Sequence, residues 1–194
     1  MRYVLLLAFI PILIIALYIY KRDVYKKEPI GELLKAFCGG MASAVVVIFI
    51  NHFIDLAGID LTSNVVLRAF VSAALIEEGT KFFFVYKLFW RNPNFDERFD
   101  GIVYAVFVSL GFAFVENILY IYQDVTNAVH IAYSRAFFAV PAHTLFAIAM
   151  GTGLGLAKFS KRNATAKITG GLISAMLIHG TYDFLLMYAE ELEA

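Results

Sequence analysis

Long apolar stretches alternate with short polar connections along the chain. Six stretches reach the length of about 20 residues that a helix needs to cross roughly 30 Å of hydrocarbon. They are 3–20, 33–54, 65–89, 102–122, 136–159 and 168–188. This pattern predicts an all-α fold, a polytopic transmembrane helix bundle of about six spans, in which residues 1–194 form a single integral membrane domain. The connection 123–135 is predicted to be a loop on the outer side.

Composition supports membrane residence. Hydrophobic residues make up 61% of the chain and charged residues 16%, which is too apolar for a water-soluble domain of this size. Sixteen basic and sixteen acidic residues leave no net charge, so the basic surface of a nucleic-acid-binding protein is absent. We expect membrane lipid and other membrane proteins as partners. The single cysteine, Cys38, excludes an intrachain disulfide and is interpreted as a small apolar residue of the second span.

The distribution of basic residues orients the bundle. Lys and Arg gather after the first, third and fifth spans, in the segments 21–35, 87–98 and 158–167, whereas the other side receives only Arg2, Arg68 and Arg135. Because short cytoplasmic loops carry the basic excess, both termini are predicted to be extracytoplasmic. A cleaved signal peptide is the alternative for the first span, but one Arg precedes it and the strong positive cluster follows it, so we interpret it as a retained anchor.

Seven acidic, basic or histidine side chains lie within the predicted spans and away from the span ends. They are Glu77, Glu78 and Lys81 in the third span, Glu116 in the fourth, His143 in the fifth, and His179 and Asp183 in the sixth. Each acid or base at a helix centre costs about 2.5 to 3.5 kcal/mol, so the five Glu, Asp and Lys residues together cost on the order of 10 kcal/mol unless paired or protonated. Such residues are functional-site candidates by default. Interhelical pairs that fix register are the alternative for a single pair.

Helical spacing predicts two local arrangements. Lys81 lies four residues after Glu77 and three after Glu78, so it can neutralise at most one of the two carboxylates well. His179 and Asp183 are four residues apart, so Asp183 can orient the imidazole. At about 1.5 Å of rise per residue, the candidates lie about 8 to 18 Å from the outer ends of their spans. One cavity that opens outward is therefore expected to hold them, whereas His52 and His130 are interpreted as ordinary interfacial residues.

The absence of other motifs narrows the chemistry. The sequence has no His-Glu-x-x-His of a zincin, no Gly-x-Ser-Gly of a rhomboid-like serine protease, and no Gly-x-Gly-Asp of a presenilin-like protease. What remains is an arrangement of Glu and His residues.

That arrangement resembles the PrsW family of intramembrane proteases, which is related to the CAAX prenyl endopeptidases and the bacteriocin-processing Abi group. Three motifs carry the resemblance from the third span onward: Glu77-Glu78-x-x-Lys81, Phe112-x-x-x-Glu116 and His179-x-x-x-Asp183, with His143 as a further matching position. The resemblance implies a multi-pass peptidase of the bacterial cell membrane. It implies a first, extracytoplasmic-side cut in a single-pass anti-sigma factor, in a cascade that releases a sigma factor during stress response.

Two mechanisms stay open at this point. In one, Glu77 or Glu78 is the general base for water, His143 or His179 stabilises the oxyanion, Asp183 orients His179, and Lys81 holds the second carboxylate. In the other, a divalent metal such as zinc takes part, and the candidate ligands are Glu77, Glu78, Glu116, His143 and His179. A proton-coupled transporter and a nonenzymatic scaffold that binds membrane helices are the alternative functions, because transporters also carry intramembrane acids and bases.

Overall fold

The computed structural model describes residues 2–193 and the side chains of residues 3–192, so the Arg2 side chain used for orientation lies outside that range. Every regular element in the described part is a helix. The elements are α1 (Arg2–Arg22), α2 (Ile30–Leu56), α3 (Val65–Leu67), the π-helical η1 (Arg68–Leu75), α4 (Ile76–Phe89), α5 (Asp100–Gln123), α6 (Ala128–Ser134), the π-helical η2 (Arg135–Ala139), α7 (Val140–Lys158) and α8 (Ala164–Glu193). The predicted all-α bundle is confirmed.

The ten elements form six long helices, because α3, η1 and α4 are continuous, as are α6, η2 and α7. Five of the six are long and apolar enough to cross a membrane. The exception is the helix over residues 65–89, which carries the charged residues Arg68, Glu77, Glu78, Lys81 and Lys87. Its charge, and not its length, separates it from the other five.

The predicted start of the fifth span was wrong. The helix begins at Ala128, not near residue 136, so most of the segment 123–135 is helical. Ala128 and Ala132 are buried in a small apolar cluster with Val4 and Ala8 of α1. This contact with α1 stabilises α6 as a helix, although the polar residues His130 and Ser134 of α6 do not favour a membrane span. As a result, Arg135 belongs to the helix and not to a loop.

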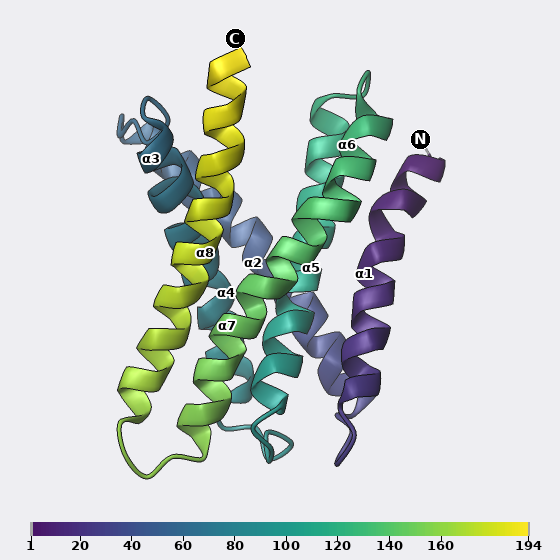
Figure 1. The fold of residues 1–194 in the computed structure, drawn as a ribbon, viewed down its shortest axis with the longest axis vertical. Coiled ribbons are helices and arrows are strands. Elements are labelled where there is room, and N and C mark those ends of the chain that lie inside the picture. The colour runs from purple at the N-terminus through teal and green to yellow at the C-terminus, as the bar shows by residue number, and fades with distance from the viewer. Residues whose placement is uncertain (1, 194) are drawn as a thin grey trace.

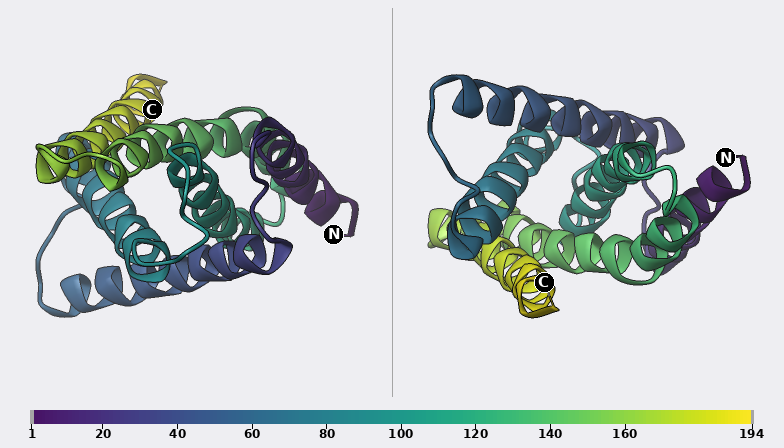
Figure 2. Two further views of the ribbon diagram at one scale, coloured as in Figure 1. Left: turned by 90° about the horizontal axis from the view of Figure 1, so that it is seen from below. Right: turned by 90° about the horizontal axis from the view of Figure 1, so that it is seen from above.

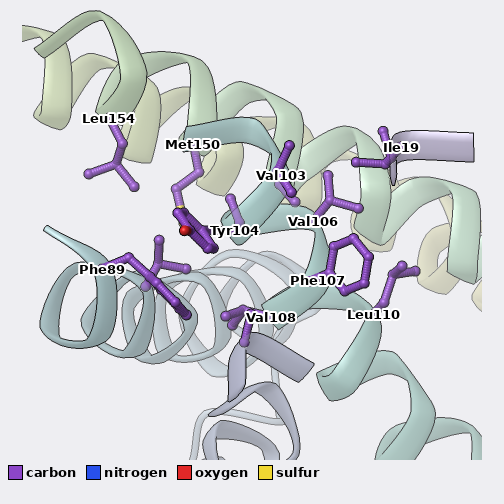
Figure 3. Packing of buried hydrophobic residues seen from close by; sticks show 14 of the residues in the cluster. Ile19, Phe89, Val103, Tyr104, Val106, Phe107, Val108, Leu110, Met150 and Leu154 are labelled. Carbon is purple, nitrogen blue, oxygen red and sulfur yellow. The ribbon is translucent and has the colours of Figure 1, made fainter. Parts of the chain in front are cut away.

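Helix α5 lies at the centre of the bundle, between α1, α2, α4 and α7 (Figure 2). Most of its apolar side chains are buried, and Tyr104 stacks on Phe89 of α4 with 3.9 Å between ring centroids (Figure 3). Two glycines of α7 allow close approach to α5 and to the connection before it: a Cβ on Gly151 would lie 2.4 Å from the Gly101 carbonyl oxygen, and one on Gly155 would lie 2.0 Å from that of Arg98. These glycines of α7 therefore serve helix packing.

Both termini lie at the same end of the bundle (Figure 1). We call this the terminal end. The connections 23–29, 90–99 and 159–163 lie at the opposite end, which we call the loop end (Figure 1). The loop end carries the basic clusters found in the sequence, as expected for a cytoplasmic side. The extracytoplasmic placement of the termini remains a prediction.

Candidate active site

Four neighbouring long helices bring the seven candidate side chains together. Glu77, Glu78 and Lys81 come from α4 and Glu116 from α5, while His143 comes from α7 and His179 and Asp183 from α8. Contacts of 3.3 Å or less link all seven into one network. The expected convergence on one place in the bundle is thus observed.

Lys81 lies at the centre of this network and is almost completely buried. Its Nζ atom lies 2.7 Å from Glu78 Oε1, 3.3 Å from Glu77 Oε2 and 3.2 Å from His143 Nδ1. It also lies 3.9 Å from the centre of the Phe112 ring, a cation–π distance. The closer pairing with Glu78 agrees with the expectation that Lys81 neutralises one carboxylate better than the other.

The contact with Lys81 fixes the protonation of His143. An ammonium group only donates hydrogen bonds, so Nδ1 of His143 accepts from Lys81 and carries no proton. The proton of the neutral ring is then on Nε2, which donates to Glu116 Oε2 at 2.7 Å. His143 is therefore a neutral imidazole whose N–H is oriented by Glu116.

His179 is in a different position, because each of its ring nitrogens faces a carboxylate. Nδ1 lies 3.0 Å from Glu78 Oε1, and Nε2 lies 3.2 Å from Asp183 Oδ2. Both nitrogens can donate only if the ring is an imidazolium. The ring plane is held by stacking on Phe146, with 4.5 Å between centroids. Asp183 thus lies where the four-residue spacing predicted it.

The two adjacent glutamates occupy different environments. Glu78 is fully buried, and its Oε2 atom has no hydrogen-bond partner. Glu77 is only partly buried and lines a cavity, whereas Glu78 does not. Consecutive helical residues point about 100° apart, as 3.6 residues per turn requires, and this turns one carboxylate into the protein and the other toward open space.

The cavity has a volume of about 470 Å³. Its inner wall includes Glu77, Glu116, His143, His179 and Asp183. Arg68, His130 and Glu190 also line it, and these three lie near the terminal ends of their helices. The cavity therefore extends from the polar network toward the terminal end of the bundle. His130, which we interpreted as an ordinary interfacial residue, contributes to this wall, while His52 is not part of it.

Two site residues were missed by the sequence reasoning. The Arg135 guanidinium donates from Nη2 to Glu116 Oε2 and from Nε to Asn117 Oδ1, both at 2.6 Å. Asn117 is fully buried and donates to the Ala8 carbonyl oxygen of α1 at 3.3 Å. The adjacent polar pair Glu116-Asn117 in an apolar span was the signal for Asn117. Arg135 gave only a weak signal, because it is one of the few basic residues predicted on the extracytoplasmic side of the membrane.

Both π-helical segments directly precede site residues. The segment η1 ends two residues before Glu77, and η2 ends four residues before His143. A π-helical turn inserts an extra residue and thereby rotates the side chains that follow it, and such turns are frequent at functional sites. The two segments therefore set which face of α4 and of α7 points to the network.

The carboxylate and imidazole groups offer two sets of metal donors. In each of the triplets Glu77, Glu116, His143 and Glu77, Glu78, His179, one donor atom per residue lies within 4.8 Å of the others. Carboxylate and imidazole donors suit zinc. The second triplet fits better, because Glu78 has a buried oxygen without a partner, and loss of the Nδ1 proton of His179 frees that nitrogen while Asp183 still accepts from Nε2–H. In the first, His143 directs Nε2–H to Glu116 and Nδ1 to Lys81, which leaves no free nitrogen.

Comparison with known proteins identifies the family. Residues 28–194 match the family model described as "PrsW family intramembrane metalloprotease". The chain belongs to the PrsW family. It is 38% identical to Protease PrsW of Geobacillus kaustophilus over 173 residues, which cover 89% of this chain and 75% of that protein.

Two further relatives agree. Protease PrsW of Clostridioides difficile is 36% identical over 186 residues, covering 94% of this chain and 78% of the relative. Protease PrsW of Bacillus subtilis is 37% identical over 170 residues, which cover 87% of this chain and 76% of that relative. No solved structure matches the chain. Membership of the PrsW family makes the chain an intramembrane peptidase, a multi-pass protein of the cell membrane, and argues against the transporter and scaffold alternatives.

The Arg135 contacts generate a prediction about stability. Arg135→Gln leaves Glu116 without its guanidinium partner in a largely buried place, and breaking such a pair costs about 3 kcal/mol or more. For a chain of this length that loss corresponds to a fall in the midpoint of thermal unfolding of about 6 to 12 °C. Unfolding of the purified protein in detergent measures it.

The matched control is Arg68→Gln, because Arg68 lines the same cavity but its Nε atom contacts only the sulfur of Met187. We expect the midpoint of this variant to stay within about 2 °C of wild type, as is usual for substitutions outside buried networks. Equal midpoints for the two variants would show that Arg135 does not stabilise Glu116.

Proposed function

We propose that this PrsW-family peptidase makes a first cut, on the extracytoplasmic side, in a single-pass membrane protein. An anti-sigma factor is the substrate class that the family resemblance favours. The observation that carries the proposal is the convergence of the acidic and imidazole side chains on a cavity that extends to the terminal end of the bundle. The basic clusters at the loop end favour an extracytoplasmic terminal end, and membrane lipid surrounds the rest of the bundle.

Glu77 is the residue we assign as general base for the attacking water. It is the member of the Glu77-Glu78 pair that lines the cavity, where water and a peptide carbonyl can reach it. Its partner Glu78 is fully buried and is held by Lys81 and His179. A base must lie within hydrogen-bond reach of the proton that it accepts, and this geometry favours Glu77.

Two histidines lie on the same cavity wall. In the metal-free mechanism, His179 is an imidazolium held between Glu78 and Asp183, and its positive charge stabilises negative charge on the carbonyl oxygen as it develops. His143 is a neutral imidazole whose N–H donates to Glu116. Arg135 also donates to Glu116 and holds it in place. Removing one preorganised group of this kind typically costs a factor of about 10² to 10³ in rate.

We infer that a transition metal such as zinc binds Glu77, Glu78 and His179, because the donor chemistry of this triplet suits zinc and the family description names a metalloprotease. When bound, zinc supplies Lewis-acid polarisation of the scissile carbonyl and of water. In that case His179 would be a neutral imidazole that offers Nδ1 to the ion, because Asp183 accepts from Nε2–H. Each residue needs to offer one donor atom only, so Glu77 retains an oxygen that can accept a proton.

The first test is cleavage. Co-expression with a single-pass anti-sigma factor from the same genome is expected to yield a truncated product with wild type. Glu77→Gln removes the proton acceptor, and we expect it to lower cleavage at least about 10²-fold, the lower end of what general-base catalysis contributes. Glu78→Gln is expected to lower cleavage and also thermal stability, because it leaves the buried charge of Lys81 poorly paired.

Glu190→Gln is the matched control, since Glu190 lines the same cavity but lies near the end of α8; it should cleave like wild type. If Glu77→Gln and Glu78→Gln, both present at normal levels in the membrane, still give the same truncation, the protease mechanism is wrong. Unchanged cleavage in only one of them identifies the less important carboxylate.

Metal content is the second test. Elemental analysis of the purified wild-type protein is expected to find about one transition metal ion per chain, as in catalytic zinc sites with three protein ligands. His179→Ala should lose that ion, whereas His52→Ala, a control outside the network, should retain it. Chelation should abolish cleavage and zinc should restore it. Full activity of a sample that elemental analysis shows to be metal-free would eliminate the metal-dependent mechanism.

A further inference from the structure

A second group of carboxylates lies at the loop end of the bundle, at the end opposite the one toward which the cavity extends. Asp23 directly follows α1, Glu97 lies in the connection before α5, and Asp100 is the first residue of α5. One carboxylate oxygen from each of the three lies within 4.8 Å of the others. Two segments that are distant in the sequence, at residues 23 and 97–100, therefore present acidic oxygens to one point. None of them takes part in the proposed cleavage.

Two of these carboxylates are buried, and each has one oxygen that accepts no hydrogen bond. Asp23 is 1% exposed and Asp100 is 0% exposed. The Oδ2 atom of Asp23 accepts from the Glu28 backbone N–H at 2.9 Å, and the Oδ2 atom of Asp100 accepts from those of Asp96 and Glu97 at 2.9 and 2.7 Å. The Oδ1 atoms of both residues are buried without a hydrogen-bond partner. Backbone amides thus fix both side chains while one oxygen of each stays free.

No basic side chain in the described part of the chain offsets these charges. Within residues 3–192, neither Lys, Arg nor His approaches a carboxylate oxygen of Asp23, Glu97 or Asp100 within 4.0 Å. The nearby Lys26 pairs with Asp96 instead. Buried ionised carboxylates without a partner are strongly unfavourable unless they are paired or coordinate a metal. A cation from outside the chain would supply the missing partner.

We propose that Asp23, Glu97 and Asp100 bind a hard divalent cation, Mg²⁺ or Ca²⁺. Both ions prefer carboxylate oxygens and complete their coordination with water, and the group contains no His or Cys that would favour zinc. Glu97 is only partly buried, which gives the ion a route from solvent. The ion joins the end of α1 to the start of α5, the central helix that carries Glu116 and Asn117 toward its other end.

Binding of each ion to the full-length protein in detergent tests the proposal. Isothermal titration with MgCl₂ and, separately, with CaCl₂ should show about one site per chain for at least one of the two ions. Asp23→Asn and Asp100→Asn each remove one charged ligand and should weaken that affinity at least about tenfold, because affinity at such sites follows the number of charged ligands. The same ion should also raise the midpoint of thermal unfolding of wild type, since it binds the folded chain.

Two controls test whether binding needs these three carboxylates in particular. One removes another buried carboxylate nearby, and the other removes a carboxylate of the proposed active site. Glu28→Gln removes a neighbouring buried carboxylate that accepts from Tyr104 but is not in the ligand group, so it should retain the ion. Glu77→Gln, which changes the proposed catalytic site, should also retain it, so the two proposals can fail independently.

Absence of binding by both ions in wild type overturns the proposal and leaves water as the partner of the free oxygens. Affinity that stays unchanged in Asp23→Asn and Asp100→Asn overturns it as well, as does binding that depends on Glu77 instead. If either aspartate variant fails to fold, Glu97→Gln decides, because Glu97 is partly exposed and its substitution disturbs no buried side chain.

Discussion

The buried ammonium group of Lys81 is the constraint on which the arrangement of the helices depends. It contacts Glu77, Glu78 and His143 within 3.3 Å, and through these residues it is connected to α5, α7 and α8. In hydrocarbon an unpaired charge of this kind costs about 2.5 to 3.5 kcal/mol or more. A shift of any of these helices along its axis would separate the charge from its partners, so the network and the helix register stabilise each other.

This constraint explains why two adjacent glutamates have different roles in our account. The pairing of Lys81 and His179 with Glu78 satisfies one carboxylate inside the protein, and Glu77 is left with the weaker contact to Lys81 and with access to the cavity. Helix α5 holds this geometry from the middle of the bundle. The C-terminal half of α5 supplies Glu116 to the network. Its first residue, Asp100, belongs to the acidic group at the loop end.

Much of the fold followed from the sequence, since apolar length predicts membrane helices well. Even the helix over 65–89, whose charges set it apart from the other five, was predicted from the length of its apolar stretch. The start of the fifth helix was not, because His130, Ser134 and Arg135 make the turn look like a polar loop until its contact with α1 is known. The Arg135 contacts depend on that turn. Likewise, which glutamate faces the cavity depends on where α7 and α8 pack, and helical spacing alone does not determine it.

The most direct test of the account is whether the polar network is reached by water from outside the cell. In a Cys38→Ser background, single cysteines at cavity-lining positions, Ala73→Cys and Ser134→Cys, should react in intact cells with a membrane-impermeant maleimide, because only a hydrated thiol ionises and reacts. Asn94→Cys, in the connection at the loop end, should react only after the membrane is permeabilised. Labelling of Asn94→Cys in intact cells, with Ala73→Cys and Ser134→Cys protected, would contradict the account.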